Sequence, residues 1–359
     1  MEINKRDVSI DICKGIGIIL MVLGHSGMPK GGHDFIYMFH MPLFFFVSGY
    51  CFSEKYLDTP IAFVKKKIKG LWLPYVKYSL LFLLLHNLFC YLHIYSPLYG
   101  YQRHGVDMLS ISQAKDSVWS VVTSMYGTDQ LLGGFWFLRE LLLGSVIAFV
   151  AMKAIRKLQQ HCQLVAISNM GGGIFLLLAS VVMNKYVLVF PCFNMGSLSV
   201  LAAAIFLAGH VYKEHKYCMN LGWTIAFAII ILLGSILKPR EIVNLEWSDT
   251  VPYFFFGVLG TVMTINVSRY ISVFAAWLGL FLSWVGRVTL TVLTWHLLAF
   301  KIVTLIIIRQ KGMSIEHLGE FPVMSVFSEQ RWWIAYFIVA MAATLAMAKI
   351  KETFVAFHK

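Results

Sequence analysis

Residues 8–27 read VSIDICKGIGIILMVLGHSG. The stretch is long and apolar enough to cross a bilayer, yet it carries Asp11, Lys14 and His25. Ionisable side chains inside a membrane are costly, and they persist where they pair with one another or carry out a function. The segment therefore predicts a membrane helix that contributes to a structural ion pair or to a functional site.

The spacing of these three residues places them along one face of the helix. Lys14 and His25 lie eleven positions apart, which returns a helical side chain to within about 20° and separates the two by roughly 16 Å along the axis. Asp11 precedes Lys14 by three positions, close enough to pair with it. One interpretation is a buried ion pair with a capping histidine, and the other is a cation and a base held at a fixed separation.

The composition indicates an all-α polytopic membrane protein. Of the 359 residues, 58% are hydrophobic and 13% are charged, whereas soluble proteins carry about 25% charged residues. Apolar runs predict about ten transmembrane helices, and 270–286 is read as an interfacial or re-entrant helix. The predicted spans are 8–27, 35–53, 71–92, 133–152, 163–183, 195–213, 217–236, 250–266, 288–308 and 331–349.

The net charge of +12 does not indicate a nucleic-acid partner, because lysines and arginines gather in short segments between the apolar runs. More of them fall in the segments that face the cytoplasm when the N-terminus is inside. This pattern predicts that both termini are cytoplasmic. Residues 1–359 are interpreted as a single membrane-embedded domain, with the lipid bilayer as its surroundings.

The second apolar segment carries the sequence FHMPLFFFVSGY at residues 39–50. His40 lies inside it, Pro42 interrupts helical hydrogen bonding beside it, and Ser48 stands near its end. The short connection 28–34 makes the first two helices antiparallel neighbours, so we expect His40 to approach His25. No third ligand is evident beside these histidines, so no metal site is predicted there.

Two later stretches also place polar residues within apolar segments. Residues 133–140 read GGFWFLRE, in which Arg139 and Glu140 are adjacent. Adjacent helical side chains point about 100° apart, so we expect the two not to face each other and at least one to find a partner on another helix. A salt bridge and a substrate role both remain open. The second stretch starts at Gly286-Arg287 and leads to His296 in mid-membrane.

A histidine inside the membrane suits general base catalysis, because its ordinary pKa is about 6.5. It takes the proton of a hydroxyl while that hydroxyl attacks an activated acyl group. A cation nearer the cytoplasm suits the negatively charged end of a long donor such as acyl-CoA. The basic residues 65–69, KKKIK, are predicted to form a cytoplasmic loop that adds phosphate contacts or acts only as a topology signal.

The chain resembles the integral-membrane acyltransferase 3 family, and within it the fucose 4-O-acetylase-like branch. The resemblance is carried by residues 11–15 with His25, by residues 39–50, by Trp136-Phe137-Leu138, and by the run from Gly286 to His296. It implies transfer of an acyl group, most often acetyl, from cytosolic acyl-CoA to a hydroxyl of a cell-envelope carbohydrate. It also implies a ten-helix core in a bacterial inner membrane.

The clusters and the resemblance together imply a set of site residues. We expect His25 and His40 to be catalytic, and we expect seven further residues, named at the end of this paragraph, to bind the donor or the acceptor. No bound cofactor is expected, acetyl-CoA is the co-substrate, and the acceptor is an envelope polysaccharide or a lipid-linked glycan. Relatives often have arginine where Lys14 stands, so a bidentate contact is not carried over. The expected binding residues are Asp11, Lys14, Ser48, Trp136, Arg139, Glu140 and His296.

Two alternatives stay open. A transporter or exporter of a glycan or small substrate would use the buried charges as a path, although no internal repeat supports it. The second alternative is that the same fold transfers succinyl or another acyl group. A succinyl carboxylate would need a cation near the thioester, which Arg139 or Lys301 would supply.

Overall fold

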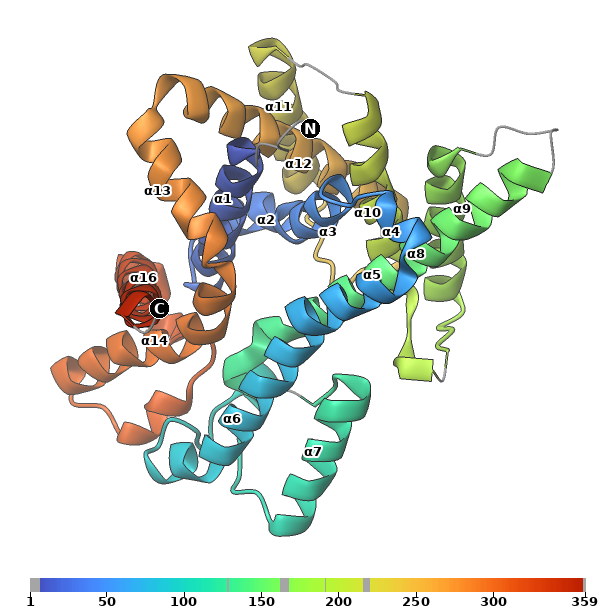
Figure 1. Cartoon of the computed structure of the whole chain (residues 1–359). Helices are drawn as coiled ribbons and strands as arrows, with labels where there is room; N and C mark the ends of the chain where they lie inside the picture. The colour runs from blue at the N-terminus through green and yellow to red at the C-terminus, as the bar shows by residue number, and fades with distance from the viewer. Residues whose placement is uncertain (1–6, 128, 162–167, 191, 216–219, 358–359) are drawn as a thin grey trace. The chain divides into compact units, whose positions relative to one another are not determined.

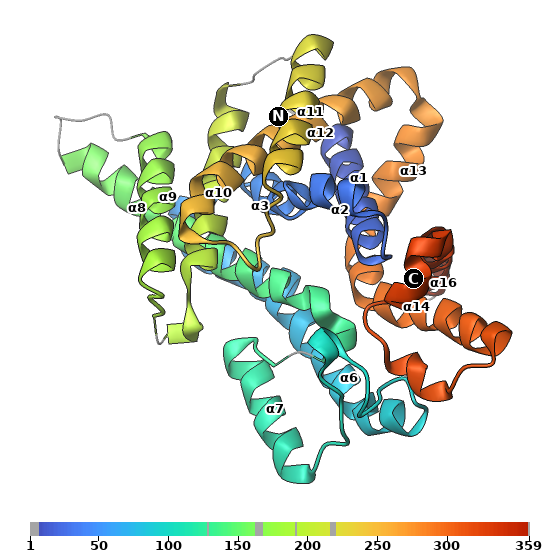
Figure 2. The same ribbon diagram turned by 180° about the vertical axis from the view of Figure 1, so that it is seen from behind.

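The computed structural model describes residues 7–127, 129–161, 168–190, 192–215 and 220–357. Helices make up the regular structure of these residues, apart from one isolated bridge between Phe190 and Met195. Figures 1 and 2 show the helices from opposite sides. The predicted all-α class is confirmed. The first residues of the predicted spans 163–183 and 217–236 lie outside the described part.

The helices are numbered in chain order, and Figure 1 labels all of them except α15. Short 3₁₀ and π turns connect or extend several of them. Their bounds are α1 Val8–His25, α2 Lys30–Tyr37, α3 His40–Tyr50, α4 Lys55–Asp58, α5 Pro60–Lys67, α6 Leu73–Tyr91, α7 Ile111–Ser124, α8 Trp136–His161, α9 Asn169–Lys185, α10 Ser197–His215, α11 Leu221–Leu237, α12 Thr250–Phe274, α13 Ala276–Arg287, α14 Thr289–Lys311, α15 Ser325–Phe327 and α16 Trp333–Phe357.

The chain forms two compact units, each assembled from separate stretches. The first unit holds Met1–Gly17, Asp34–Leu73 and Phe137–Arg287. In it, α10 packs against α3 and α9, and α12 packs against α3, α11 and α13. The second unit holds Ile18–His33, Pro74–Trp136 and Val288–Lys359, and its main helix pair is α14 with α16.

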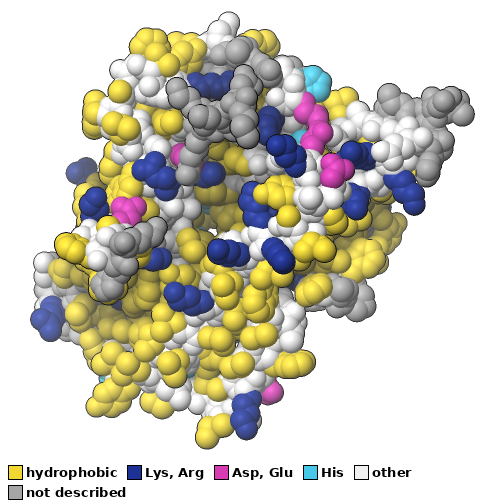
Figure 3. Space-filling view, in the orientation of Figure 1, with side chains coloured by type: hydrophobic (Ala, Val, Ile, Leu, Met, Phe, Trp, Pro, Cys, Tyr) yellow, Lys and Arg dark blue, Asp and Glu magenta, His cyan; other side chains and the backbone are white. Residues whose placement is uncertain are grey.

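Among the described residues, six helical stretches are long and apolar enough to cross a membrane. Large apolar side chains such as Leu84, Phe274 and Trp277 are exposed on the helices, and hydrophobic side chains cover much of the face in Figure 3. Lipid accommodates such surfaces, so the chain is a multi-pass membrane protein. The predicted number of crossings and the orientation of the termini stay predictions. The six stretches are Val8–His25, Pro60–Tyr91, Gln130–Gln160, Trp247–Phe274, Thr289–Lys311 and Gln330–Phe357.

The predicted span 35–53 is not one helix, because the chain breaks between α2 and α3. Phe39 has φ −146° and ψ −17°, outside the helical region. Pro42 explains the break, because its ring would clash with the carbonyl of Met38 and it has no N–H to donate. The proline is tolerated in the first turn of α3, where N–H groups have no intrahelical acceptor.

The basic residues 65–69 are helical, and the prediction of a loop there is wrong. Lys65, Lys66 and Lys67 end α5, and a π-helical turn at Ile68–Trp72 carries the chain into α6. Long lysine side chains keep their ammonium groups in water while their stems lie along a helix, so a basic run need not end one. The predicted span 71–92 thus begins as early as Pro60.

The ambiguous segment 270–286 is divided between two helices. The end of α12 reaches Phe274, beyond the predicted boundary at 266, and α13 follows with 12 residues. A helix of that length extends about 18 Å, which is short of the roughly 30 Å hydrocarbon core. This length agrees with the predicted interfacial or re-entrant helix.

Loop contacts in the second unit meet at Glu316. Ser96 donates its hydroxyl to Oε2 at 2.6 Å, and His93 Nδ1 lies 2.9 Å from Oε1. The hydrogen bond from Ser96 and the nearby His93 lower the pKa of Glu316 below its ordinary value. The carboxylate therefore favours the folded loops when it is ionised.

We expect Glu316→Gln to lower Tm by about 2 °C at pH 7. When folding lowers the pKa of a carboxylate, the carboxylate stabilises the fold at pH values above the pKa that it has in the unfolded chain. This contribution is lost as the pH falls through the pKa that it has in the folded protein. The difference in Tm from wild type should therefore shrink below about pH 4.5. Thermal unfolding in detergent between pH 3.5 and 7.5 measures it. The exposed Asp116→Asn serves as control, and a pH-independent difference would contradict the assignment.

Candidate functional site

Two predicted site histidines meet in the second unit. His25 ends α1 and His296 lies in α14, yet His25 Nδ1 is 3.0 Å from His296 Nε2. Their rings stack with centroids 5.2 Å apart and an interplanar angle of 17°. His296 is fully buried, whereas His25 retains some exposure. The contact joins residues 271 positions apart in sequence.

The hydrogen-bond partners determine where the protons of this pair sit. His296 Nδ1 lies 3.1 Å from the carbonyl of Val292 and 3.0 Å from that of Leu293. Carbonyl oxygens only accept, so Nδ1 of His296 carries its proton and Nε2 accepts from Nδ1–H of His25. Nε2 of His25 then has an unshared electron pair. A neutral imidazole in this tautomer can take a proton at Nε2.

The Gly-Gly-Phe-Trp motif packs beside His296. Residues 130–135 form a turn against α14, where Gly134 meets Leu293 and Gly133 lies near Leu297. These two leucines stand in the same stretch of α14 as the histidine. Trp136 follows the turn, half-buried at the start of α8. Two motifs that are far apart in sequence thus meet around one turn of α14.

His40 bridges the break between α2 and α3 in the first unit. It is buried, and its Nδ1 lies 3.0 Å from the carbonyl of Ile36. In an unbroken helix the backbone N–H of residue 40 would donate to this carbonyl, so the imidazole replaces a lost backbone bond. The approach of His40 to His25 stays a prediction, because the two belong to different units.

Asp11 and Lys14 pair as predicted, with Lys14 Nζ 3.4 Å from Oδ1 of Asp11. Asp11 is buried, and Lys14 keeps part of its side chain exposed. The same turn of α1 packs tightly on α13. A Cβ on Gly286 would lie 1.9 Å from the Asp11 carbonyl oxygen, so no larger residue fits there without a shift. The Gly286 motif therefore supports the turn that carries Asp11 and Lys14.

Sequence reasoning missed a partner for Ser48. Lys67 Nζ lies 3.4 Å from the Ser48 hydroxyl oxygen in the first unit. The ammonium also lies over the rings of Phe63 and Phe206, at 5.5 and 5.6 Å from their centroids. Apolar periodicity continued back through 60–67 would have indicated that this lysine is helical. The predicted phosphate-contact segment and the predicted binding serine are thus in contact.

Arg139 and Glu140 face each other, and the prediction that they cannot is wrong. Nη1 of Arg139 donates to Oε1 of Glu140. The 100° separation holds for Cβ directions, but these long side chains bend toward each other beyond Cβ. Ser199 of α10 donates to Oε2 of Glu140 at 2.6 Å, and Arg139 donates to the carbonyls of Phe193 and Asn194. The predicted partner on another helix is therefore confirmed, and no sequence signal pointed to Ser199.

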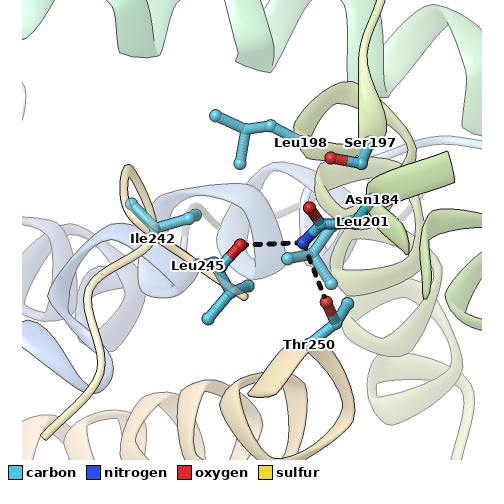
Figure 4. Close-up of a pocket in the computed structure, with 7 residues that line it drawn as sticks. All are labelled: Asn184, Ser197, Leu198, Leu201, Ile242, Leu245 and Thr250. Atoms are coloured by element: carbon cyan, nitrogen blue, oxygen red, sulfur yellow. Dashed lines mark hydrogen bonds between the residues drawn. The ribbon is translucent and has the colours of Figure 1, made fainter. Parts of the chain in front are cut away.

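A small pocket in the first unit lies between α9, α10 and the start of α12 (Figure 4). The Asn184 amide donates to the Leu245 carbonyl at 2.8 Å and to the Thr250 hydroxyl at 3.3 Å across it. Its volume of about 20 Å³ admits about one water molecule. It is too small for an acyl donor or a saccharide.

We expect Glu140→Ala to destabilise the protein by about 3–5 kcal/mol, because it leaves the buried Arg139 guanidinium without its carboxylate. Ser199→Ala removes a single hydrogen bond and should cost about 1 kcal/mol. Unfolding of the two variants in detergent micelles measures the difference. Equal losses in both variants would contradict a buried ion pair as the main contact.

A family model described as an acyltransferase domain matches residues 7–349. The nodulation protein NolL of Sinorhizobium fredii is 45% identical over 67 residues, which cover 16% of this chain and 18% of that protein. NolL of Mesorhizobium japonicum is 44% identical over 61 residues, which cover 14% and 16%. The chain thus spans less than a fifth of the length of these relatives. No solved structure matches it.

Proposed function

The chain belongs to the acyltransferase 3 family, and we propose that it moves an acetyl group from cytosolic acetyl-CoA to a hydroxyl of a cell-envelope polysaccharide or lipid-linked glycan. Membership of the family implies an acyltransferase enzyme. The observation that carries the proposal is the contact between His25 and His296, which leaves Nε2 of His25 able to accept a proton. We place the protein in the bacterial inner membrane.

In the proposed reaction, Nε2 of His25 takes the proton of the acceptor hydroxyl as its oxygen attacks the thioester carbonyl carbon. The new C–O bond forms, the C–S bond breaks, and the CoA sulfur leaves with the proton that His25 returns. His296 holds the other ring nitrogen of His25, so it acts as a positioning residue. His40 either positions the substrate or shares the role of general base with His25. Trp136 contributes to substrate binding.

We propose that residues of the first unit bind the donor. Lys14 and Asp11 order the entry for the donor, and Lys67 beside Ser48 supplies a further cation. The phosphates of acetyl-CoA are anionic, and ammonium groups that retain exposure can bind them as point charges. This assignment agrees with the predicted cytoplasmic position of Lys14 and of residues 65–69.

The cations considered for a succinyl group already bind protein groups. Lys301 donates to the carbonyls of Leu318 and Glu320 at 2.9 and 2.6 Å, and Arg139 is paired with Glu140. A succinyl carboxylate would have to displace these buried contacts, which is costly. Because both cations already bind protein groups, we favour acetyl over succinyl as the transferred group. We propose that Arg139 and Glu140 support substrate binding by fixing α8 against α10.

We expect His25→Ala to lower acetyl transfer by about 10²–10⁴-fold, since it removes the general base. The measurement follows radiolabel from acetyl-CoA into the glycan fraction of membranes that contain the full-length protein, together with release of free CoA. His104→Ala, in an exposed loop, is the matched histidine control. Normal transfer by His25→Ala would refute the assignment, and uptake of substrate without thioester consumption would indicate a transporter.

His296→Ala and His296→Gln separate positioning from simple packing. Loss of the acceptor for Nδ1–H of His25 should lower kcat by up to about 100-fold and leave KM for acetyl-CoA nearly unchanged. The glutamine carbonyl can still accept this proton, so His296→Gln should recover part of kcat and restore the pH profile. Identical profiles in both variants would contradict the positioning role.

Lys14→Ala should raise KM for acetyl-CoA by about tenfold and change KM for the acceptor little, because it removes a charged contact to a donor phosphate. Lys14→Arg keeps the charge and should stay close to wild type. The exposed Lys153→Ala is the control for a general loss of positive charge. A larger change in acceptor KM than in donor KM would move Lys14 to the acceptor side.

A further inference from the structure

Three potential metal ligands gather at the end of α10 in the first unit. His210 and Glu214 stand one helical turn apart on α10, and Glu54 lies in the turn before α4. His210 Nε2 is 3.4 Å from Oε1 of Glu214 and 3.6 Å from Oε1 of Glu54. The three donor atoms all lie within 4.8 Å of one another. The cluster plays no part in the proposed acyl transfer.

His210 is buried without a hydrogen-bond partner. Its exposed fraction is 2%, and neither ring nitrogen meets the geometry of a hydrogen bond among the described residues, although the Glu54 and Glu214 carboxylates lie beside Nε2. Burying an imidazole in this way is costly, so a missing partner calls for an explanation. A protonated His210 would draw the carboxylates to about 2.8 Å. The longer distances to Glu54 and Glu214 do not fit that explanation.

The distances fit ligands around a shared cation. Metal–ligand bonds of about 2.0–2.2 Å at tetrahedral angles separate neighbouring ligand atoms by about 3.3–3.6 Å. The two separations from His210 Nε2 fall in this range. Both glutamates are exposed, so their carboxylates can adjust and a further coordination position can be open to water.

The surrounding packing holds the histidine in place. The Phe52 ring meets that of His210 edge to face at 5.6 Å between centroids. Lys213, the cation nearest to the cluster on α10, donates to the Phe52 carbonyl at 3.1 Å. Close backbone contact fixes α3 against α10, since a Cβ on Gly209 would lie 2.0 Å from the Phe46 carbonyl oxygen. The buried ligand is thus pre-positioned.

We propose that Glu54, His210 and Glu214 bind a divalent transition-metal ion, with zinc as the best fit to one imidazole and two carboxylates. Imidazole favours zinc and its neighbours over magnesium and calcium, which prefer sites made of oxygen atoms alone. The ion would join the turn after α3 to the last turns of α10. The site belongs to the cytosol-facing region predicted from the sequence.

The test uses the full-length protein, purified in detergent through an affinity tag that contains no histidine and stripped with a chelator. Zinc chloride is titrated by calorimetry, and bound zinc is counted by elemental analysis after dialysis. We expect one zinc ion per chain and a rise in Tm when zinc is added. Cobalt(II) should give the visible absorption of a tetrahedral site.

The variants separate this site from adventitious binding. His210→Ala should lose the zinc, the Tm rise and the cobalt spectrum, whereas His215→Ala, an exposed histidine on the same helix, should keep all three. Should His210→Ala fail to fold, the exposed double change Glu54→Gln/Glu214→Gln tests the site and should weaken zinc binding at least tenfold. Absence of binding in wild type, or unchanged binding in these variants, would overturn the proposal.

Discussion

Close backbone contact at glycines is the constraint on which the first unit depends. Lipid is as apolar as the helices it surrounds, so membrane helices associate by close packing rather than by hydrophobic burial. Gly286 meets the carbonyl of Asp11, and Gly49 meets that of Phe206, at distances that leave no room for a side chain. The first contact holds the turn with Lys14 on α13. The second holds α3, with Ser48, on α10.

The residue types of the candidate site were predictable, but most of their contacts were not. Costly ionisable groups in apolar segments pointed to His25 and His296 without indicating that they touch. Contacts between residues so far apart in sequence depend on how helices pack, which periodicity does not report. The pairing of Arg139 with Glu140 was missed because helical angles describe Cβ directions and not the ends of long side chains.

Local sequence rules gave mixed results for the fold. The pair Asp11–Lys14 and the short α13 agree with expectations from spacing and length. Pro42 was recognised as an interruption, but the complete break at Phe39 was not. The predicted acyltransferase 3 family is confirmed by the match over residues 7–349. Several short motifs that occur in a fixed order along a chain can thus identify a family even where the contacts between individual residues cannot be predicted.

The helix that runs from Pro60 to Tyr91 is longer than a bilayer requires. Its 32 residues extend about 48 Å, while the hydrocarbon core is about 30 Å thick. The surplus of about 18 Å is enough to carry Lys65, Lys66 and Lys67 into the headgroup layer. Each lysine near an anionic leaflet contributes about 1 kcal/mol of attraction. The charge of the surrounding lipids would thereby help to set the depth of this helix and the position of Lys67 beside Ser48.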